Sequence, residues 1–144
     1  MRVDFYILEA DAEHERLRTA CRLAEKAWQR GHRVFIHAGS ASLARLVDDI
    51  LWTYRQDSFV PHALWPDRVD VGEDRREPVL IGDGTGEPAD IDVLINLAED
   101  IPGFADRSAR VAEIVPGDDA GRRSGRARYR IYRERGVAIE QHNL

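Results

Sequence analysis

The N-terminal half of the chain alternates between short apolar runs and longer segments with helical periodicity, and this order constrains the fold more than any other feature. Residues 2–8 and 33–38 are short and rich in β-branched and aromatic side chains, as buried strands are. Strands that alternate with helices build a parallel sheet with right-handed connections. The helical period is carried by Leu17, Cys21, Ala24 and Trp28, and again by Leu43, Leu46, Val47, Ile50 and Leu51.

The C-terminal half continues the same pattern less regularly. Residues 78–81, 91–97 and 110–115 are further candidate strands, and residues 118–135 are expected to be helical in their C-terminal part, up to Gly136. Residues 137–139 could add a last strand, whereas residues 52–74 have neither period and are expected to form a long connection. With 144 residues the sequence predicts one α/β domain over 1–144, in three layers, with a mostly parallel sheet of about five strands.

Composition limits the class of protein. The chain is 43% hydrophobic and 33% charged, which suits a soluble globular protein. Its single cysteine, Cys21, cannot form an internal disulfide and has no Cys/His cluster around it, as is typical of a reducing compartment. Asp4 and Glu9 interrupt the only early apolar run, so neither a signal peptide nor a membrane span is expected. We therefore expect a cytoplasmic protein that does not bind membranes.

A glycine-rich stretch at residues 82–89 invites comparison with phosphate-binding loops. It lacks a Lys-Ser/Thr pair and is not followed by a helix, so we interpret it as a turn. The first strand-to-helix turn contains no glycine and carries Glu9 and Asp11, whose charges would repel a pyrophosphate. The sequence therefore predicts no functional nucleotide site and no cofactor.

No residue pattern of a catalytic or metal site is apparent. Asp90 and Asp92 precede a strand rather than follow it, and we interpret them as acids that mark the start of that strand. The histidines are scattered, with only His37 near a predicted ligand-binding rim, and Cys21 lies on an apolar helix face as an unreactive core residue. We expect a protein that is not an enzyme by itself, and a small nucleotide-dependent α/β enzyme remains an alternative.

The strongest anomaly in the sequence is electrostatic. Between Gly121 and Arg135 the charge is +6, which leaves −11 for the rest of a chain whose total is −5. At about 100° per residue, Arg122, Arg126, Tyr129, Arg130 and Arg133 share one arc of the helix, whereas Ala127 and Ile131 lie opposite and are expected to face the sheet. The positive charge comes from Arg122, Arg123, Arg126, Arg128, Arg130, Arg133 and Arg135.

A run of charge usually marks a solvated helix face, but such faces mix both signs and this one does not. Arginines bind carboxylates bidentately, and a tyrosine among them offers an apolar wall. The pattern therefore favours an acidic peptide with an apolar anchor. Direct binding of single-stranded DNA remains an alternative, although the −11 carried by the rest of the chain opposes a polyanion.

A second candidate surface is aromatic. Trp52, Tyr54, Phe59 and Trp65 fall within or beside the long connection. They either cover the protein's own core or form an apolar patch that a partner covers.

Together these segments resemble the chi subunit of bacterial DNA polymerase III, over nearly the whole chain. The most specific feature is Leu51-Trp52 followed by a Ser-Phe-Val-Pro-His run at residues 58–62, at the right distance before the terminal helix. The other matching segments are FYIL at 5–8, AWQRG at 27–31, DVLINL at 92–97 and RARYRIYR at 126–133.

The resemblance implies a Rossmann-like fold without a working nucleotide site and a non-catalytic adaptor of the replisome, with no metal. Chi subunits bind the psi subunit, which tethers them to the clamp loader, and the acidic C-terminal tail of single-stranded-DNA-binding protein, so DNA would be reached only indirectly. Carried over by position, the tail-binding residues are Val115, Arg122, Arg126, Tyr129 and Arg130. The residues expected to bind psi are Trp52, Phe59, Val60, Pro61 and Leu64.

Overall fold

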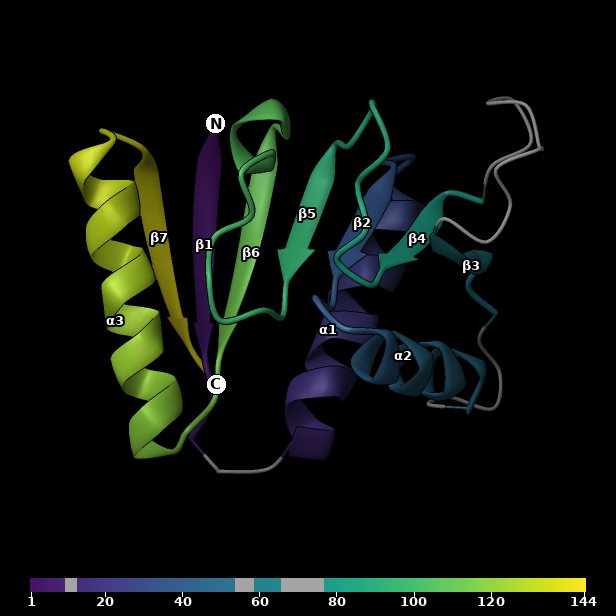
Figure 1. The fold of residues 1–144 in the computed structure, drawn as a ribbon, viewed down its shortest axis with the longest axis horizontal. Coiled ribbons are helices and arrows are strands. Elements are labelled where there is room, and N and C mark those ends of the chain that lie inside the picture. Colours follow the sequence, from purple (N-terminus) through teal and green to yellow (C-terminus); the bar gives the residue numbers. More distant parts are fainter. Residues whose placement is uncertain (10–12, 54–58, 66–76) are drawn as a thin grey trace.

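One seven-stranded parallel sheet organises the molecule (Figure 1). The computed structural model describes residues 1–9, 13–53, 59–65 and 77–144, and its strands are ordered β3-β4-β2-β5-β6-β1-β7. The strands are β1 (Arg2–Ile7), β2 (Val34–His37), β3 (His62–Trp65), β4 (Val79–Gly82), β5 (Val93–Asn96), β6 (Arg110–Val115) and β7 (Ala138–Asn143). The helices are α1 (Glu13–Gln29), α2 (Ala41–Thr53), α3 (Asp119–Glu134) and the 3₁₀ helix η2 (Ala105–Arg107).

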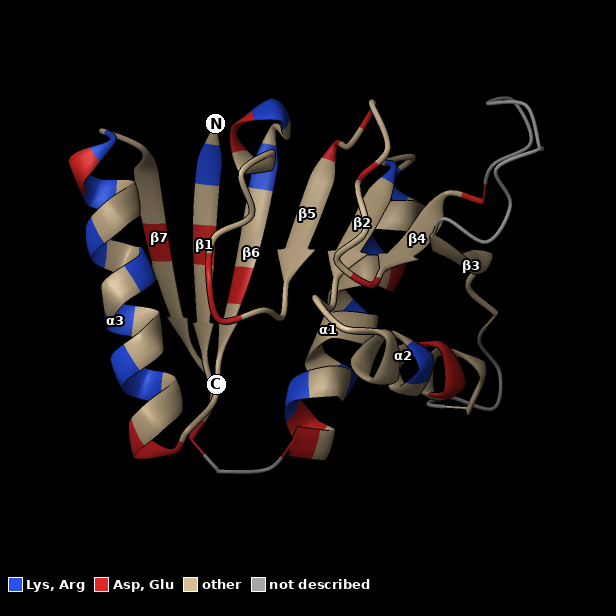
Figure 2. Ribbon diagram, viewed as in Figure 1, with Lys and Arg blue, Asp and Glu red and all other residues tan. Residues whose placement is uncertain are grey.

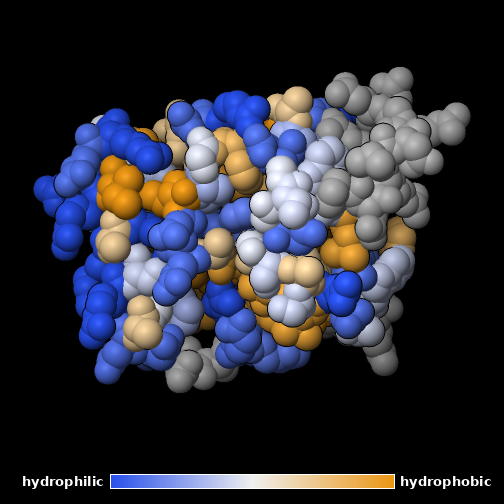
Figure 3. All heavy atoms as spheres, in the orientation of Figure 1, coloured by the Kyte–Doolittle hydropathy of each residue, from blue (hydrophilic) through white to orange (hydrophobic). Residues whose placement is uncertain are grey.

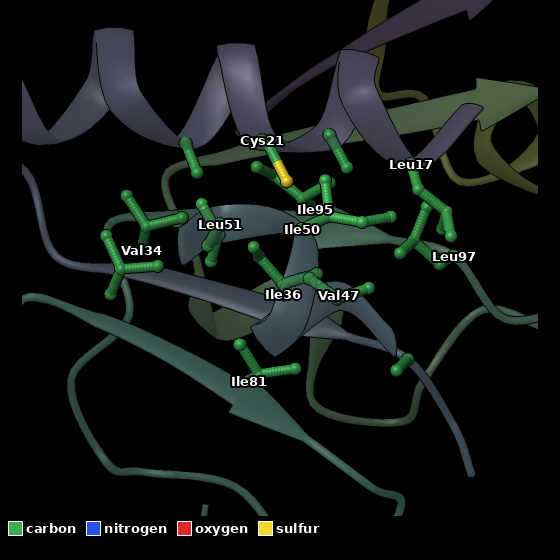
Figure 4. Packing of buried hydrophobic residues seen from close by; sticks show 14 of the residues in the cluster. Leu17, Cys21, Val34, Ile36, Val47, Ile50, Leu51, Ile81, Ile95 and Leu97 are labelled. Carbon is green, nitrogen blue, oxygen red and sulfur yellow. The ribbon is translucent and has the colours of Figure 1, made fainter. Parts of the chain in front are cut away.

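The helices cover the two faces of the sheet unequally. α1 and α2 pack on one face, where Leu17 and Cys21 meet Ile36 and Ile95 in the larger core cluster (Figure 4). α3 lies on the other face beside β1, β6 and β7, and there Tyr132 packs with Phe5 in a second cluster. The three-layer α/β architecture with a parallel sheet is therefore confirmed, and α3 stands alone over one end of the sheet.

Two expectations about the elements were wrong. The described residues form seven strands rather than about five. Four residues of the supposed connection form the edge strand β3, and the last strand, only a possibility at residues 137–139, is present as β7. Edge strands are often short and half-exposed, so β3 lacks the apolar alternation that would reveal it. α3 begins at Asp119 and is helical throughout, not only in its C-terminal part. Three residues named in the sequence analysis lie outside the described residues: Asp11 of the first strand-to-helix turn, Tyr54 of the aromatic surface and Ser58 of the Ser-Phe-Val-Pro-His run.

Several side chains have the structural roles that the sequence suggested. The Asp92 carboxylate accepts a hydrogen bond from the Arg33 backbone N–H (2.7 Å), and Asp90 pairs with the Arg33 guanidinium (2.9 Å) at the start of β5. Burial raises the pKa of the Cys21 thiol to about 12, which keeps it protonated and unreactive. A side chain at Gly82 would overlap the Phe35 ring, so close packing explains that glycine without a phosphate. None of the described helices has the length and apolarity needed to cross a membrane.

A buried carboxylate holds three strands together at the α3 end of the sheet. Asp4 on β1 is fully buried and accepts hydrogen bonds from Arg110 of β6 (2.7 Å), Arg2 (3.0 Å) and His142 of β7 (3.1 Å). Burial alone would raise the pKa of Asp4, but these hydrogen bonds from His142, Arg110 and Arg2 outweigh it, so the pKa lies below its ordinary value of 3.8. The ionised form of Asp4 therefore stabilises the fold.

Asp4→Asn should reduce the free energy of unfolding by about 1–3 kcal/mol at neutral pH, since charge-assisted hydrogen bonds are lost. Because the folded-state pKa is lowered, this contribution is complete above the unfolded-state value and is lost as the pH falls through the folded-state pKa. Urea unfolding of wild type and variant from neutral to acid pH measures the difference. The account expects the difference to shrink below about pH 4, and a gap that stays constant into the acid range would contradict it.

Candidate binding site

The local sequence explains where α3 begins and ends. The Asp118 side chain caps the N-terminus by accepting a hydrogen bond from the Gly121 backbone N–H (3.4 Å), and Asp119 follows in the first turn. The last turn carries Arg133, and Gly136 follows with φ at +75°, a left-handed conformation that suits a helix end. Acids at the start and arginines toward the end both complement the helix dipole. Figure 2 shows the basic residues recurring along nearly the whole helix.

A buried polar network fixes the rotation of α3 on the sheet. Glu113 on β6 is fully buried and accepts hydrogen bonds from Arg128 Nε (2.8 Å) and the Tyr132 hydroxyl (2.8 Å), both on α3. Asn96 on β5 donates a third hydrogen bond from Nδ2 (3.0 Å). The other end of the Arg128 guanidinium donates to the Glu99 carbonyl (2.8 Å). The charge of Arg128 is therefore neutralised inside the protein.

The network also sets the protonation of its members. Burial raises the pKa of Glu113, and the Arg128 charge with the hydrogen bonds from Asn96 and Tyr132 opposes that shift. Burial and the nearby Glu113 carboxylate raise the pKa of Tyr132, so its hydroxyl stays protonated and donates. A buried carboxylate with three donors is costly to disturb, because each donor that is removed leaves a polar group without its partner.

The expectation that Ala127 and Ile131 face the sheet was wrong. The buried residues of α3 are Gly125, Arg128 and Tyr132, whereas Ala127 is exposed and Ile131 is 40% exposed. The positions of the apolar residues gave the wrong orientation for α3, because a buried acid on the neighbouring strand determines which side of the helix faces the sheet. The other six arginines of the helix and its C-terminus remain exposed: Arg122, Arg123, Arg126, Arg130, Arg133 and Arg135.

A glycine allows α3 to approach the sheet closely. A Cβ at Gly125 would lie 2.8 Å from Cγ1 and 2.9 Å from Cγ2 of Val115 on β6, closer than such atoms pack. Any larger residue at position 125 would push the helix away from the strand. Gly125 is buried and lines the pocket described next.

A pocket of about 370 Å³ lies between α3 and the neighbouring strands. All five residues that the sequence assigned to peptide-tail binding line it. Figure 3 shows hydrophilic side chains covering this edge of the molecule, with hydrophobic side chains beside them. The lining residues are Phe5, Ile7, Val115, Arg122, Gly125, Arg126, Tyr129, Arg130, Arg133 and Gln141.

The pocket combines an apolar floor with a basic rim. Phe5, Ile7 and Val115 come from β1 and β6, and the half-buried Tyr129 ring packs edge-on against Phe5 with ring centroids 5.3 Å apart. The rim consists of Arg122, Arg126, Arg130 and Arg133. Within the described part of the chain, none of these four guanidinium groups forms an ion pair, although Arg122 Nε donates to the Gly117 carbonyl (3.0 Å). Such a site can bind carboxylates at its rim and an apolar group at its floor.

Sequence reasoning missed four of the lining residues: Phe5, Ile7, Gly125 and Gln141. Phe5 and Ile7 alternate along β1 with Asp4 and Tyr6, which face the opposite side of the sheet. The two-residue period of a strand therefore indicates that Phe5 and Ile7 share one face. Which face of β1 lies under α3 could not be derived from the sequence, because it depends on the order of the strands. Gln141 enters the pocket only because β7 pairs with β1.

The aromatic surface lies at the far end of the sheet from α3. Trp52 at the end of α2 is 55% exposed and Phe59 is 60% exposed, with ring centroids 5.6 Å apart. The buried His62 ring lies 4.6 Å from the Trp52 ring. Of the other residues expected there, Val60 is buried in the core and Leu64 is half-buried against it, while Pro61 is half-buried. Among the described residues, the exposed rings of this surface are therefore those of Trp52 and Phe59.

Asp4, Glu140 and His142 could bring three ligand atoms within 4.8 Å of one another. Asp4 already accepts hydrogen bonds from Arg2, Arg110 and His142, and Glu140 pairs with Arg2. Two guanidinium groups compensate these carboxylates, and their positive charge disfavours a cation. We interpret the group as a set of ion pairs.

The fold and the pocket define a Rossmann-like α/β protein with an arginine-lined surface site. The family model described as DNA polymerase III chi subunit, HolC, matches residues 1–140. The chain belongs to this family of DNA polymerase III subunits.

Similar proteins agree with this assignment. A Pseudomonas aeruginosa protein named DNA polymerase III subunit chi is 39% identical over 143 residues, covering 99% of this chain and 96% of that protein. Proteins of the same name from Haemophilus influenzae and Escherichia coli are 32% and 30% identical, covering 97% and 94% of this chain and 95% and 92% of those proteins.

Solved structures support the fold at a greater distance. The C-terminal domain of a variant of S. cerevisiae Dbp5, bound to Gle1 and IP6, has a TM-score of 0.54 and 12% sequence identity, with 98% of this chain and 90% of that chain covered. A Dbp5 structure with Nup159, Gle1, IP6 and ADP has a TM-score of 0.58 and 14% identity, with 98% of this chain and 41% of that chain covered. At this identity the likeness concerns the fold alone.

Arg128→Met should reduce the free energy of unfolding by about 3–5 kcal/mol, because it leaves the buried Glu113 carboxylate without its counter-charge. Adding Glu113→Gln to Arg128→Met should restore part of that loss, since the double variant buries no unpaired charge. Urea unfolding of both single variants and the double variant gives the coupling energy. Additive losses, with the double variant as unstable as the sum of the two single variants, would contradict a coupled pair.

Proposed function

We propose that this chain is a non-catalytic adaptor of the DNA polymerase III holoenzyme that binds the acidic C-terminal tail of single-stranded-DNA-binding protein. Any polymerase activity then belongs to the holoenzyme. The observation that carries the proposal is the pocket in which four arginines surround an apolar floor. In this proposal residues 1–144 act as one domain in the cytoplasm, associated with the replisome.

The geometry of the pocket suits a short acidic chain end. Carboxylates of the tail would pair with Arg126 and Arg130, and an apolar side chain at its end would lie on Val115 beside Tyr129. The rim arginines make no ion pairs of their own among the described residues, so binding breaks no internal pair. Tyr129 is already held by Phe5, so little side-chain freedom is lost on binding.

The two alternatives have less support. A single strand of DNA that extends beyond α3 would lie close to the other residues of this protein, which carry a net charge of −11. Repulsion from these residues weakens DNA binding relative to binding of a short peptide. A nucleotide-dependent enzyme would need a phosphate loop. The glycine-rich segment instead forms a turn in which Asp83 Oδ1 accepts a hydrogen bond from the Thr85 backbone N–H (2.9 Å).

Tethering would allow weak contacts with a single tail to hold the adaptor on the coated DNA. A DNA strand coated with single-stranded-DNA-binding protein presents several tails close together, so one tail that dissociates is quickly replaced by another. The psi subunit would connect this chain to the clamp loader through a separate surface. Within the described part of the chain, Trp52 and Phe59 offer exposed rings for that contact, and they lie at the opposite end of the sheet from α3.

Arg126→Ala or Tyr129→Ala should weaken binding of a peptide with the tail sequence by about 1–3 kcal/mol, because each removes a charged or aromatic anchor. Isothermal titration calorimetry measures the effect. Arg123→Ala is the matched control, since Arg123 is an exposed arginine of the same helix that does not line the pocket. Wild-type affinity in both pocket variants, or an equal loss in the control, would overturn the proposed site.

Trp52→Ala and Phe59→Ala should each weaken binding of the psi subunit roughly tenfold or more, the loss expected for an exposed aromatic anchor. Copurification and surface plasmon resonance with psi provide the measurement. Leu46→Ala serves as control, because Leu46 is another exposed apolar residue of α2. Unchanged psi binding in both variants would show that psi docks elsewhere, and the tail-binding proposal would be unaffected.

A further inference from the structure

A second basic pocket lies on the opposite face of the sheet from the tail pocket. It has a volume of about 250 Å³ and lies where the C-terminal part of α1 meets β1 and β6, and we call it the α1–β1 groove. Its floor is apolar, formed by Leu23, Ala27 and Ala112 among others. The side chains of β1 alternate between the two sites: Phe5 and Ile7 line the tail pocket, whereas Tyr6 lines the groove.

The charged residues of the groove are all basic. Lys26 is exposed in the last turn of α1, the exposed Arg30 directly follows the helix, and Arg110 contributes from β6. No carboxylate lines the groove, and within the described residues neither Lys26 nor Arg30 forms an ion pair. The Arg110 guanidinium is fixed by Asp4 at 2.7 Å, so it stays in place at the edge of the site.

An aromatic wall completes the groove. The Tyr6 ring stacks on His142 with centroids 4.8 Å apart and an interplanar angle of 14°, which holds the ring in one orientation. A fixed ring beside an apolar floor can pack against a flat group, and the cations at the rim attract a phosphate. A nucleotide can satisfy the cations with its phosphate and cover the apolar floor and the Tyr6 ring with its base or sugar.

We propose that the α1–β1 groove binds a nucleotide unit of single-stranded DNA. The phosphate lies between Lys26 and Arg30, and the base or sugar covers the apolar floor next to Tyr6. This proposal goes beyond the adaptor function, in which DNA is reached only through partner proteins. The net charge of −11 outside residues 121–135 opposes a long strand, so the proposal is confined to one nucleotide unit at the two exposed cations. Because the two pockets lie on opposite faces of the sheet, a bound tail and a bound strand do not compete for the same residues.

The test is fluorescence anisotropy with a labelled oligothymidylate at several low salt concentrations. The wild-type chain should bind, and Lys26→Gln/Arg30→Gln should weaken binding at least tenfold. The slope of log affinity against log salt should fall in magnitude by about 0.7, the value for one lost single-strand phosphate contact. Both substituted side chains are exposed, one in the last turn of α1 and one directly after it, and thermal unfolding confirms that the variant is folded.

Arg123→Gln/Arg135→Gln is the matched control, because it removes the same charge from exposed positions that line neither pocket. It should leave oligothymidylate binding within about twofold of wild type. No binding by the wild-type chain at low salt would overturn the proposal. An equal loss in both double variants would also overturn it, because binding would then follow total charge and not this groove.

Discussion

The buried contact between Glu113 and Arg128 is the interaction on which the arrangement of α3 depends. The acid comes from β6 and the arginine from α3, and Tyr132 and Asn96 complete the hydrogen bonds of the carboxylate. Turning the helix on its axis would break all the contacts from α3 at once and leave a charge buried without compensation. One helix rotation is therefore strongly preferred.

That rotation determines what the surface offers. With Arg128 directed inward, Arg122, Arg126, Arg130 and Arg133 surround the apolar side chains of β1 and β6, and Gly125 lets the helix lie close enough to form the pocket wall. The helix thus has one inner arginine that fixes its position and four outer arginines that are free of ion pairs within the described residues. The same sheet has the exposed rings of Trp52 and Phe59 at its other end and the α1–β1 groove on its other face. Together with the tail pocket, these are three separate surfaces that partners could bind.

Much of the fold could be predicted from the sequence because it depends on the local periodicity of apolar residues. The alternation of strands and helices predicted the parallel sheet. The five residues that the chi-like pattern grouped line one pocket: Val115, Arg122, Arg126, Tyr129 and Arg130. The rest depends on contacts between distant segments. Ala127 and Ile131 were misplaced because a helix wheel cannot reveal a buried acid on a strand, and Phe5 and Gln141 were missed because strand order brings them under α3. β3 was missed because four residues at a sheet edge, one buried and three half-buried, carry no clear period.

The central claim is that the face of α3 fixed by Glu113 and Arg128 binds the acidic tail. The most direct measurement is a two-dimensional ¹H–¹⁵N NMR titration of the labelled chain with the tail peptide. The account predicts that chemical shifts change in residues 122–133 of α3 and in Phe5, Ile7 and Gln141 of the adjoining strands. Changes confined to the Trp52 and Phe59 surface, or no changes at saturating peptide, would contradict it.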